Sequence, residues 1–413
     1  MKKLFCLIMC VAFIIQCSFT ALGAQRVVRE TEEEIPSTFS SAVPGGEDKS
    51  KLPVDIKAKS AVLMDVQSGK VLMSFNPDIK LYPASVTKIM TILLVAEAVD
   101  SKRITLADKV TCSANAASKG GSQVWLEEGE QMTVDELLRA TVIGSANDAA
   151  TLLGEYISGS ESAFVALMNA RAKELGMKNT NFLNATGLDD TTEAHLTTAR
   201  DIGIMSCELL KHDFITDYTT VWMDSLRNGE TELVNTNKLV RFYEGTTGLK
   251  TGTTAKAGCC VSASAKRDNL HLVAVVMGSE ISNDRFETAK AMLSWGFSNY
   301  ISYTPEIPVG AIKPVEVIGG RAQTVEVSAP RILTELIKKG EEEKITVKTE
   351  LCENVCAPVV EGQTLGSVTV MNGENILAEY KLTAINGVKK LTLPDVWLKM
   401  LNFLATGETK YPY

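Results

Sequence analysis

The chain has 413 residues, of which 45% are hydrophobic, and a formal net charge of −8. That length and apolar content can bury a large core, which excludes a disordered chain and predicts two or more domains. The negative charge makes the chain a poor nucleic-acid binder, so we expect no nucleic-acid partner.

The first 24 residues have the layout of a secretory signal peptide. Lys2 and Lys3 precede an apolar run that reaches about Thr20, and small residues follow as far as Ala24. A permanent membrane anchor is the alternative, but the run is barely long enough to span a bilayer. We predict export with cleavage near Ala24. Residues 25–55 are rich in Glu, Ser, Pro and Gly without periodicity, which predicts a flexible leader.

Residues 56–304 are expected to form one α+β domain. Two apolar runs around the turn VQSGK predict a hairpin, and the run SVTKIMTILLVAEAV predicts a helix. A capping box at Thr133 and Glu136 opens another predicted helix. AGCCVSASAKR and LHLVAVVMG predict a second hairpin, and RFETAKAMLSWGFSNY a closing helix. Strands at both ends with helices between them predict an antiparallel sheet that joins the two ends of the domain.

The pattern changes from about residue 305. Short alternating runs, QTVEVSA, EKITVKTEL, GSVTVMNG and LAEYKLTA, are separated by Gly and Pro and predict a small all-β domain over 305–393. The last segment, 394–413, contains PDVWLKMLNFLATG, which predicts a short amphipathic helix. This helix is too short to span a membrane, and it can either pack on the β domain or lie in a membrane interface.

Cysteine and histidine usage argues against a metal site. Six cysteines follow the predicted signal peptide, and the adjacent pair Cys259 and Cys260 lies in an apolar stretch, where small buried side chains are the simplest interpretation. Cys352 and Cys356 could bridge two nearby strands or a loop. The three histidines have no ligand spacing to a cysteine or to one another, so we expect no metal and no cofactor.

Ser85 and Lys88 lie three positions apart at the start of the first predicted helix. At that spacing the two side chains share a face, so a neutral lysine could take the proton of the serine and make its Oγ a nucleophile. Backbone N–H groups at a helix N-terminus could stabilise the oxyanion that results. Alone this pair is weak evidence, because a serine near a helix start is usually a cap.

Two further motifs follow in order. Ser-Ala-Asn occurs at 113–115 and at 145–147, and we favour the second copy because it lies at the junction of two predicted helices. Lys-Thr-Gly occurs at 250–252, just before a predicted apolar strand, where Gly252 would let a substrate backbone approach.

Ser-x-x-Lys, Ser-x-Asn and Lys-Thr-Gly in this order form the signature of penicillin-binding proteins and serine β-lactamases. From about Ala58 to the C-terminus the chain resembles the low-molecular-mass penicillin-binding proteins that are D-alanyl-D-alanine carboxypeptidases, the S11 serine peptidases. The segments YPASVTKIMT, GSANDAA, NATGLDD, HLTTARDIG and TGLKTGTTAKAG carry the resemblance. It implies a transpeptidase-like catalytic domain, a trailing β domain and a terminal amphipathic helix.

The resemblance also implies roles for the motif residues. Ser85 would be the acyl-enzyme nucleophile, Lys88 its general base and Ser145 the proton relay to the leaving amine. Asn147 would bind the substrate amide. Lys250 would hold the terminal carboxylate with the help of Thr251 and Thr253, and Arg285 would assist. The backbone N–H groups of Ser85 and Thr253 would form the oxyanion hole.

The sequence departs from the family pattern at two positions, because Ala146 stands where Gly or Asp is common and Thr253 stands where some members have His. Neither change removes a reacting group. His195 lies in a segment that is structural in the family, so we expect it to pack or to form hydrogen bonds.

The implied activity is removal of the terminal D-alanine from peptidoglycan pentapeptide stems, with β-lactams as covalent inhibitors. A serine β-lactamase is one alternative, but Thr180 stands where class A enzymes carry the deacylating glutamate. A non-catalytic stem-binding protein is another, and the intact Ser85 and Lys88 argue against it. Endopeptidase or transpeptidase activity stays open. The expected location is the outer face of the cytoplasmic membrane, with peripheral attachment through the terminal helix.

Overall fold

The computed structural model describes residues 26–28, 52–189 and 193–406, and the chain divides into two compact units, one ending at Ser298 and one beginning at Asn299. The predicted signal peptide and most of the predicted leader lie outside the described residues. Within the described part, no helix is long and apolar enough to cross a membrane.

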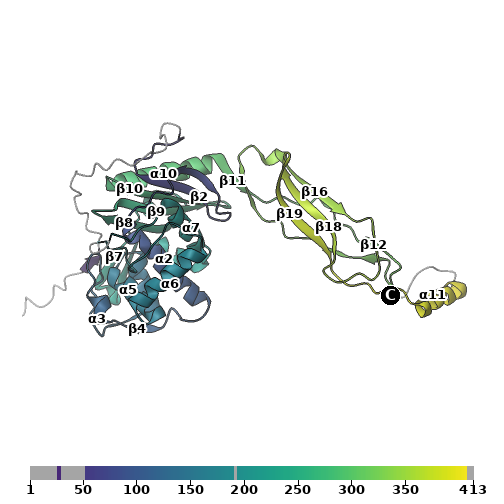
Figure 1. Cartoon of the computed structure of the whole chain (residues 1–413), viewed down its shortest axis with the longest axis horizontal. Coiled ribbons are helices and arrows are strands. Elements are labelled where there is room, and N and C mark those ends of the chain that lie inside the picture. The colour runs from purple at the N-terminus through teal and green to yellow at the C-terminus, as the bar shows by residue number, and fades with distance from the viewer. Residues whose placement is uncertain (1–25, 29–51, 190–192, 407–413) are drawn as a thin grey trace, which may run out of the picture. The chain divides into compact units, whose positions relative to one another are not determined.

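The first unit is built on a five-stranded antiparallel sheet (Figure 1). Its strand order is β3-β2-β10-β9-β8, with bounds β2 Ser60–Asp65, β3 Val71–Phe75, β8 Thr246–Thr254, β9 Gly258–Arg267 and β10 Leu270–Ser279. Both predicted hairpins are present, and β2 pairs with β10. The expectation of an α+β domain whose sheet joins its two ends is therefore confirmed.

Helices cover both faces of this sheet (Figure 1). Because successive side chains of a strand point to opposite faces, Val62 and Met64 lie against Gly203 of α7, whereas Leu63 lies against Gly296 of α10. A Cβ at either glycine would meet these side chains at 2.4–3.4 Å. This two-sided cover explains why β2 is buried along its whole length.

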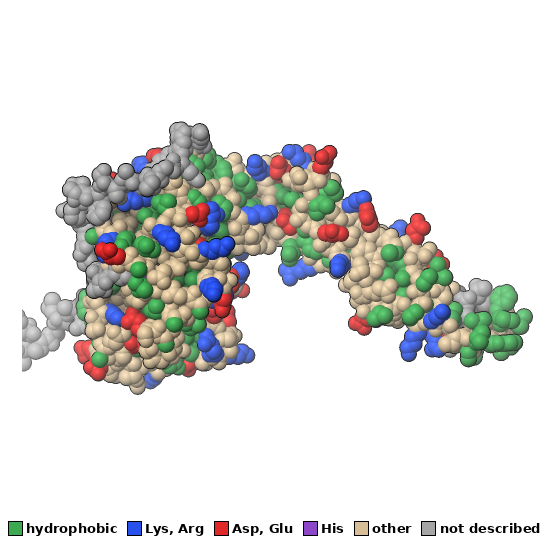
Figure 2. Space-filling view, viewed as in Figure 1, with side chains coloured by type: hydrophobic (Ala, Val, Ile, Leu, Met, Phe, Trp, Pro, Cys, Tyr) green, Lys and Arg blue, Asp and Glu red, His purple; other side chains and the backbone are tan. Residues whose placement is uncertain are grey.

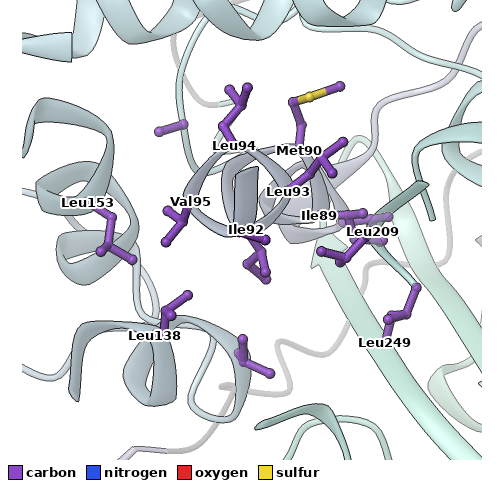
Figure 3. Packing of buried hydrophobic residues seen from close by; sticks show 14 of the residues in the cluster. Ile89, Met90, Ile92, Leu93, Leu94, Val95, Leu138, Leu153, Leu209 and Leu249 are labelled. Carbon is purple, nitrogen blue, oxygen red and sulfur yellow. The ribbon is translucent and has the colours of Figure 1, made fainter. Parts of the chain in front are cut away.

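The longer helices of the first unit are α2 Lys88–Asp100, α4 Val134–Val142, α5 Asn147–Ser158, α6 Glu161–Glu174, α7 Ala199–Leu209 and α10 Ser282–Asn299. α2 is apolar around its circumference, as expected of a helix surrounded by other elements. Figure 3 shows its side chains packed among Leu138 of α4, Leu153 of α5, Leu209 of α7 and Leu249 of β8. The predicted capping box of Thr133 and Glu136 is present at the start of α4.

Short elements complete the first unit. They are the strands β1 Arg26–Val28, β4 Lys109–Thr111, β5 Gln131–Thr133, β6 Met223–Leu226 and β7 Thr231–Val234, the α-helical turns α3 Ala114–Ala117, α8 Thr216–Thr219 and α9 Leu239–Phe242, and the 3₁₀ turns η2 Ala84–Thr87, η3 Asp213–Ile215 and η4 Arg227–Gly229. β1 lies in the segment predicted to be a flexible leader and pairs in parallel with β7. A strand of three residues has too little alternation to be recognised in the sequence.

The second unit is all-β apart from short and terminal helices. Its sheets are β11-β15, β13-β12-β17 and β14-β19-β18-β16. The strand bounds are β11 Tyr300–Tyr303, β12 Val315–Ile318, β13 Thr324–Val325, β14 Val327–Ser328, β15 Glu335–Lys338, β16 Ile345–Leu351, β17 Asn354–Cys356, β18 Thr364–Asn372 and β19 Asn375–Ala384, with a 3₁₀ turn η5 Glu342–Lys344. β11 precedes the predicted boundary at residue 304, but it pairs with β15 and so belongs to this unit.

The chain's last described element is α11, Leu393–Thr406. The Asp395 carboxylate accepts hydrogen bonds from the backbone N–H and the hydroxyl of Thr392. It also forms an ion pair with Arg321, and this pair joins the start of the helix to the β domain. The apolar side chains of α11 are exposed to solvent (Figure 2). They are Leu393, Val396, Trp397, Leu398, Met400, Leu401, Phe403 and Leu404.

Candidate active site

Ser85 lies in η2, the turn that leads into α2, and Lys88 is the first residue of α2. The Lys88 side chain is fully buried. Its Nζ donates to Ser85 Oγ at 2.9 Å, to Asn147 Oδ1 at 2.5 Å and to the carbonyl oxygen of Thr186 at 3.1 Å. The spacing of three residues therefore does bring the amine to the hydroxyl, and these three acceptors are all neutral oxygens.

The turn that carries Ser85 is fixed by a loop that ends at Gly187. Gly187 has φ +86°, and a Cβ on it would lie 1.8 Å from the carbonyl oxygen of Ala84. Thr91 Oγ1 donates to the carbonyl of Ala185 at 2.7 Å. Only glycine fits this close approach, so residues 185–187 support the turn that carries the serine.

His195 supports the same turn from a buried position. Its Nδ1 accepts a hydrogen bond from the Leu183 N–H at 3.1 Å, so the neutral ring carries its proton on Nε2 and donates to Thr87 Oγ1 at 2.9 Å. Burial lowers the pKa of His195 to about 4, which keeps the ring neutral near pH 7. The prediction that His195 packs and forms hydrogen bonds is confirmed.

The second Ser-Ala-Asn copy lies at the junction of α4 and α5, next to Lys88. Ser145 has φ +60° and is fully buried, and its Oγ has no hydrogen-bond partner among the described residues. Asn147 accepts from Lys88 and donates through Nδ2 to the carbonyl of Gly120 at 2.7 Å. The first copy has another role, because Ser113 caps α3 and donates to Glu155.

Lys-Thr-Gly lies inside β8, and the apolar strand that was predicted to follow it is β9. β8 is the edge strand of the sheet, where polar residues and glycine are tolerated. Lys250 is buried and its Nζ donates to the carbonyl of Thr251 at 3.0 Å. A Cβ on Gly252 would lie 2.8 Å from the Ser85 backbone nitrogen, so β8 runs directly beside the serine turn.

Arg285, on α10, lies under the end of this strand and is 4% exposed. Its Nη1 donates to Thr253 Oγ1 at 2.8 Å and to the carbonyl of Gly252 at 3.0 Å. The guanidinium therefore contacts Thr253, one of the residues expected to bind the substrate carboxylate, and the expected assistance by Arg285 stays a prediction.

Two contributors to the site carry no motif signal. The carbonyl of Thr186 binds Lys88 through its backbone, which side-chain patterns cannot reveal. Thr236 accepts a 2.7 Å hydrogen bond from Thr251, although Thr236 lies outside the segments that resemble the family. Asp148, in contrast, is buried and directly follows Asn147 at the start of a predicted helix. An acidic residue next to the motif is a sequence signal that could have identified Asp148 as part of the site.

The site therefore brings together a serine beside a buried amine, a second buried hydroxyl and a second buried lysine on an edge strand. The model of the D-alanyl-D-alanine carboxypeptidase family matches residues 47–281, and that of the penicillin-binding protein 5 C-terminal domain matches residues 308–390. The chain belongs to the D-alanyl-D-alanine carboxypeptidase family. The family expected from three ordered motifs is thereby confirmed.

Individual members of this carboxypeptidase family are similar to the chain in sequence and in structure. D-alanyl-D-alanine carboxypeptidase DacF of Bacillus subtilis is 42% identical, over 86% of this chain and 91% of its own length. Penicillin-binding protein 5 from Haemophilus influenzae is 31% identical, covers 82% of this chain and 99% of its own, and gives a TM-score of 0.69. Penicillin-binding protein D2 from Listeria monocytogenes, solved in an ampicillin-bound form, is 29% identical over 60% of this chain and 100% of its own, with a TM-score of 0.52.

Proposed function

We propose that this carboxypeptidase removes the terminal D-alanine from peptidoglycan pentapeptide stems through an acyl-enzyme on Ser85. Ser85 Oγ attacks the carbonyl carbon of the penultimate D-alanine, the amide C–N bond breaks, and free D-alanine leaves. Water then hydrolyses the ester and restores the serine. The observation that carries this proposal is the 2.9 Å contact between Ser85 Oγ and the buried Lys88 Nζ.

Lys88 serves as the general base. A neutral Lys88 amine has two N–H groups, which match Asn147 Oδ1 and the Thr186 carbonyl, and its lone pair then accepts the Ser85 proton across the 2.9 Å contact. Ser145 relays a proton to the leaving amine, and its buried Oγ, which has no partner among the described residues, is available for that exchange. The second hydrogen of Asn147 Nδ2 remains for the substrate amide, since the first goes to Gly120.

β8 supplies the other side of the cleft. Lys250 binds the substrate carboxylate together with the hydroxyls of Thr251 and Thr253, and Gly252 admits the substrate backbone beside the strand. The backbone N–H groups of Ser85 and Thr253 form the oxyanion hole. This role is supported by the close approach of Gly252 to the Ser85 nitrogen. Arg285 contributes through Thr253, to which it donates.

Covalent capture of penicillin tests the nucleophile, because a β-lactam presents a strained amide to the same cleft. We expect intact-mass analysis to find one penicilloyl adduct on the wild-type chain and none on Ser85→Ala. Release of D-alanine from a D-Ala-D-Ala peptide should disappear in the same variant. An adduct on both chains would overturn the assignment.

The β-lactamase alternative is less well supported, because it needs a base that activates water against the acyl-enzyme. Thr180, at the position of the class A glutamate, bonds instead to Asp201 and Thr197. We therefore expect the penicilloyl adduct to persist for far longer than the natural acyl-enzyme. Rapid loss of the adduct with turnover of penicillin would favour the alternative.

We also propose that the mature chain works outside the cytoplasmic membrane and attaches to its outer surface through α11. The exposed apolar side chains of α11 support an interfacial position, since water is an unfavourable environment for so many of them on one short helix. Deleting residues 394–413 should move active protein from the membrane pellet to the soluble fraction. If the shortened chain still sediments with membranes, the attachment lies elsewhere.

A further inference from the structure

A loop at residues 120–126 lies directly against the Ser-Ala-Asn segment. Asn147 donates through Nδ2 to the Gly120 carbonyl and through its backbone N–H to the Ser122 carbonyl, both at 2.7 Å. The carboxylate of the next residue, Asp148, accepts the N–H groups of Val124 and Leu126 at 3.1 and 3.0 Å. The loop is therefore held by the same two residues that open α5.

Arg227 holds this loop from the other side. Its Nη1 donates to the carbonyl of Val124 at 2.8 Å, and the guanidinium also pairs with Glu130 at 2.7 Å. Hydrogen bonds with Asp148, Arg227 and Asn147 thus fix the backbone of the loop that carries Trp125.

Trp125 has an unusual conformation for its size. Its φ is +53°, a region that bulky residues rarely adopt, and its side chain is 43% exposed while Val124 and Leu126 on either side are buried. Glycine at position 125 would relieve the backbone strain, and a polar side chain there would expose less apolar surface to water. A large ring kept in a strained and exposed position beside an active site indicates a role in binding.

We propose that Trp125 is a specificity-determining residue of this carboxypeptidase, and that its ring contacts the side chain of the residue that precedes D-Ala-D-Ala in the stem. The inference rests on the proposed function, because it assumes that such a stem occupies the cleft. The loop is in direct contact with Asn147, because Asn147 Nδ2 donates to the Gly120 carbonyl and would lie 2.7 Å from a Cβ on Gly121. A stem whose amide is bound by Asn147 would therefore extend beside this loop.

The surroundings of the ring indicate which side chain it selects. An aromatic face binds both an aliphatic chain and a cation at its end. Glu127 and Glu128, which follow Leu126 in the chain, have exposed side chains. A long aliphatic side chain that ends in an amine would match the ring and the two carboxylates, whereas a methyl group would reach neither.

Two peptides test this selection: Nα-acetyl-L-Lys-D-Ala-D-Ala, with its free ε-amine, and Nα-acetyl-L-Ala-D-Ala-D-Ala. We expect the wild-type chain to favour the lysine peptide in kcat/KM by roughly tenfold, the scale of one aromatic contact with a cation. Trp125→Phe should keep most of this preference. Trp125→Gly, which removes the ring and relieves the strained φ, should reduce it to within about twofold while still hydrolysing the alanine peptide.

Trp222→Ala is the matched control, because Trp222 is a half-buried tryptophan of the same unit, whose ring has an edge contact with Phe242 and a cation–π contact with Arg241. It should leave the peptide preference unchanged. An equal preference in the wild-type chain and in Trp125→Gly would overturn the proposal.

A binding measurement separates this inference from the catalytic proposal. In Ser85→Ala, the lysine peptide should shield part of the tryptophan fluorescence from acrylamide quenching, and Ser85→Ala combined with Trp125→Phe should lose that shielding. Identical quenching in the two variants would refute contact with Trp125. A wild-type chain that shows the shielding but releases no D-alanine would instead refute the proposed function.

Discussion

At the scale of single residues, the two buried lysines of the site have different hydrogen-bond partners. Lys88 contacts the Ser85 hydroxyl, whereas Lys250 lies on β8 and donates to a backbone carbonyl of its own strand. A base must be able to lose its proton, but a carboxylate ligand must keep its charge. The two lysines should therefore respond differently to substitution by arginine, which stays charged.

Lys88→Arg should abolish acylation by penicillin even where the fold survives, because a permanent cation cannot accept the serine proton. Lys250→Arg should keep partial activity, whereas Lys250→Ala should lower kcat/KM by about a hundredfold, as expected when a charged hydrogen bond to substrate is lost. D-alanine release from diacetyl-Lys-D-Ala-D-Ala measures all three variants. Near-normal activity of Lys88→Arg beside an inactive Lys250→Arg would make Lys250 the base.

His195 should make the stability of the chain depend on pH. Its pKa is lowered to about 4 in the folded state and returns to about 6.5 on unfolding, so between these values the unfolded chain binds more protons. The free energy of unfolding should then fall as the pH is lowered through this window, by about 3 kcal/mol from this residue between pH 7 and pH 4.

The variant His195→Gln isolates that contribution, since glutamine can bond to Thr87 but does not titrate. Urea unfolding at a series of pH values should give a flatter pH dependence for His195→Gln than for the wild-type chain. Parallel curves for the two proteins would contradict the assigned neutral state of the ring.

The reacting groups could be predicted from the sequence, but the groups that hold them could not. Ser85, Lys88 and Lys250 carry side chains with a known reactive use and stand at fixed spacing, so a motif can identify them. The Thr186 carbonyl and the Gly187 contact with Ala84 depend on backbone position. Such contacts join residues about a hundred positions apart and leave no local pattern.

At the scale of elements, the position of β8 beside η2 determines how closely the Lys-Thr-Gly motif approaches Ser85. The nearest atoms to a Cβ on Gly252 would be backbone atoms of Pro83, Ser85 and Val86, at 2.8–2.9 Å. Backbone cannot move aside as a flexible side chain can. Even an alanine here must therefore separate the strand from the serine turn.

Gly252→Ala should slow acylation by penicillin by about a hundredfold, because a misplacement near 1 Å removes the reacting geometry. Its melting temperature should change little, since β8 is an edge strand. Stopped-flow or mass-spectrometric acylation rates measure the effect. Unchanged acylation in Gly252→Ala would argue against this contact.

Elements with strong local signals were predictable, and elements stabilised by tertiary pairing were less so. The capping box at Thr133 and the apolar hairpin of β9 and β10 follow from short-range pattern. β8 reads TTGLKTGTT, which is polar and rich in glycine, and it forms a strand because β9 pairs with it along its length. β1 has the same dependence on its partner β7.

At the scale of the whole molecule, the described contacts of the catalytic residues all lie within the first unit. The second unit has its own buried core, formed among others by Val317, Val368 and Leu382. Each unit therefore has the internal packing that an independent domain needs.

A chain that ends at Asn299 should keep penicillin acylation and D-alanine release within about twofold of the full chain, because it retains α10 and every described site contact. Circular dichroism would check that the shortened chain is folded. A folded but inactive product would mean that the second unit contributes to the site in a way that the first unit's contacts do not reveal.

The pairing of β2 with β10 joins Ala61 to Val276, near the two ends of the catalytic unit. Contacts between residues so distant in sequence form slowly, whereas the helices between them can form early. A chain that emerges N-terminus first would therefore present Ser85 long before β8 arrives beside it. We expect Ser85 to be unreactive while the chain is being synthesised. It should become reactive only when β8 to β10 have been synthesised and have joined the sheet.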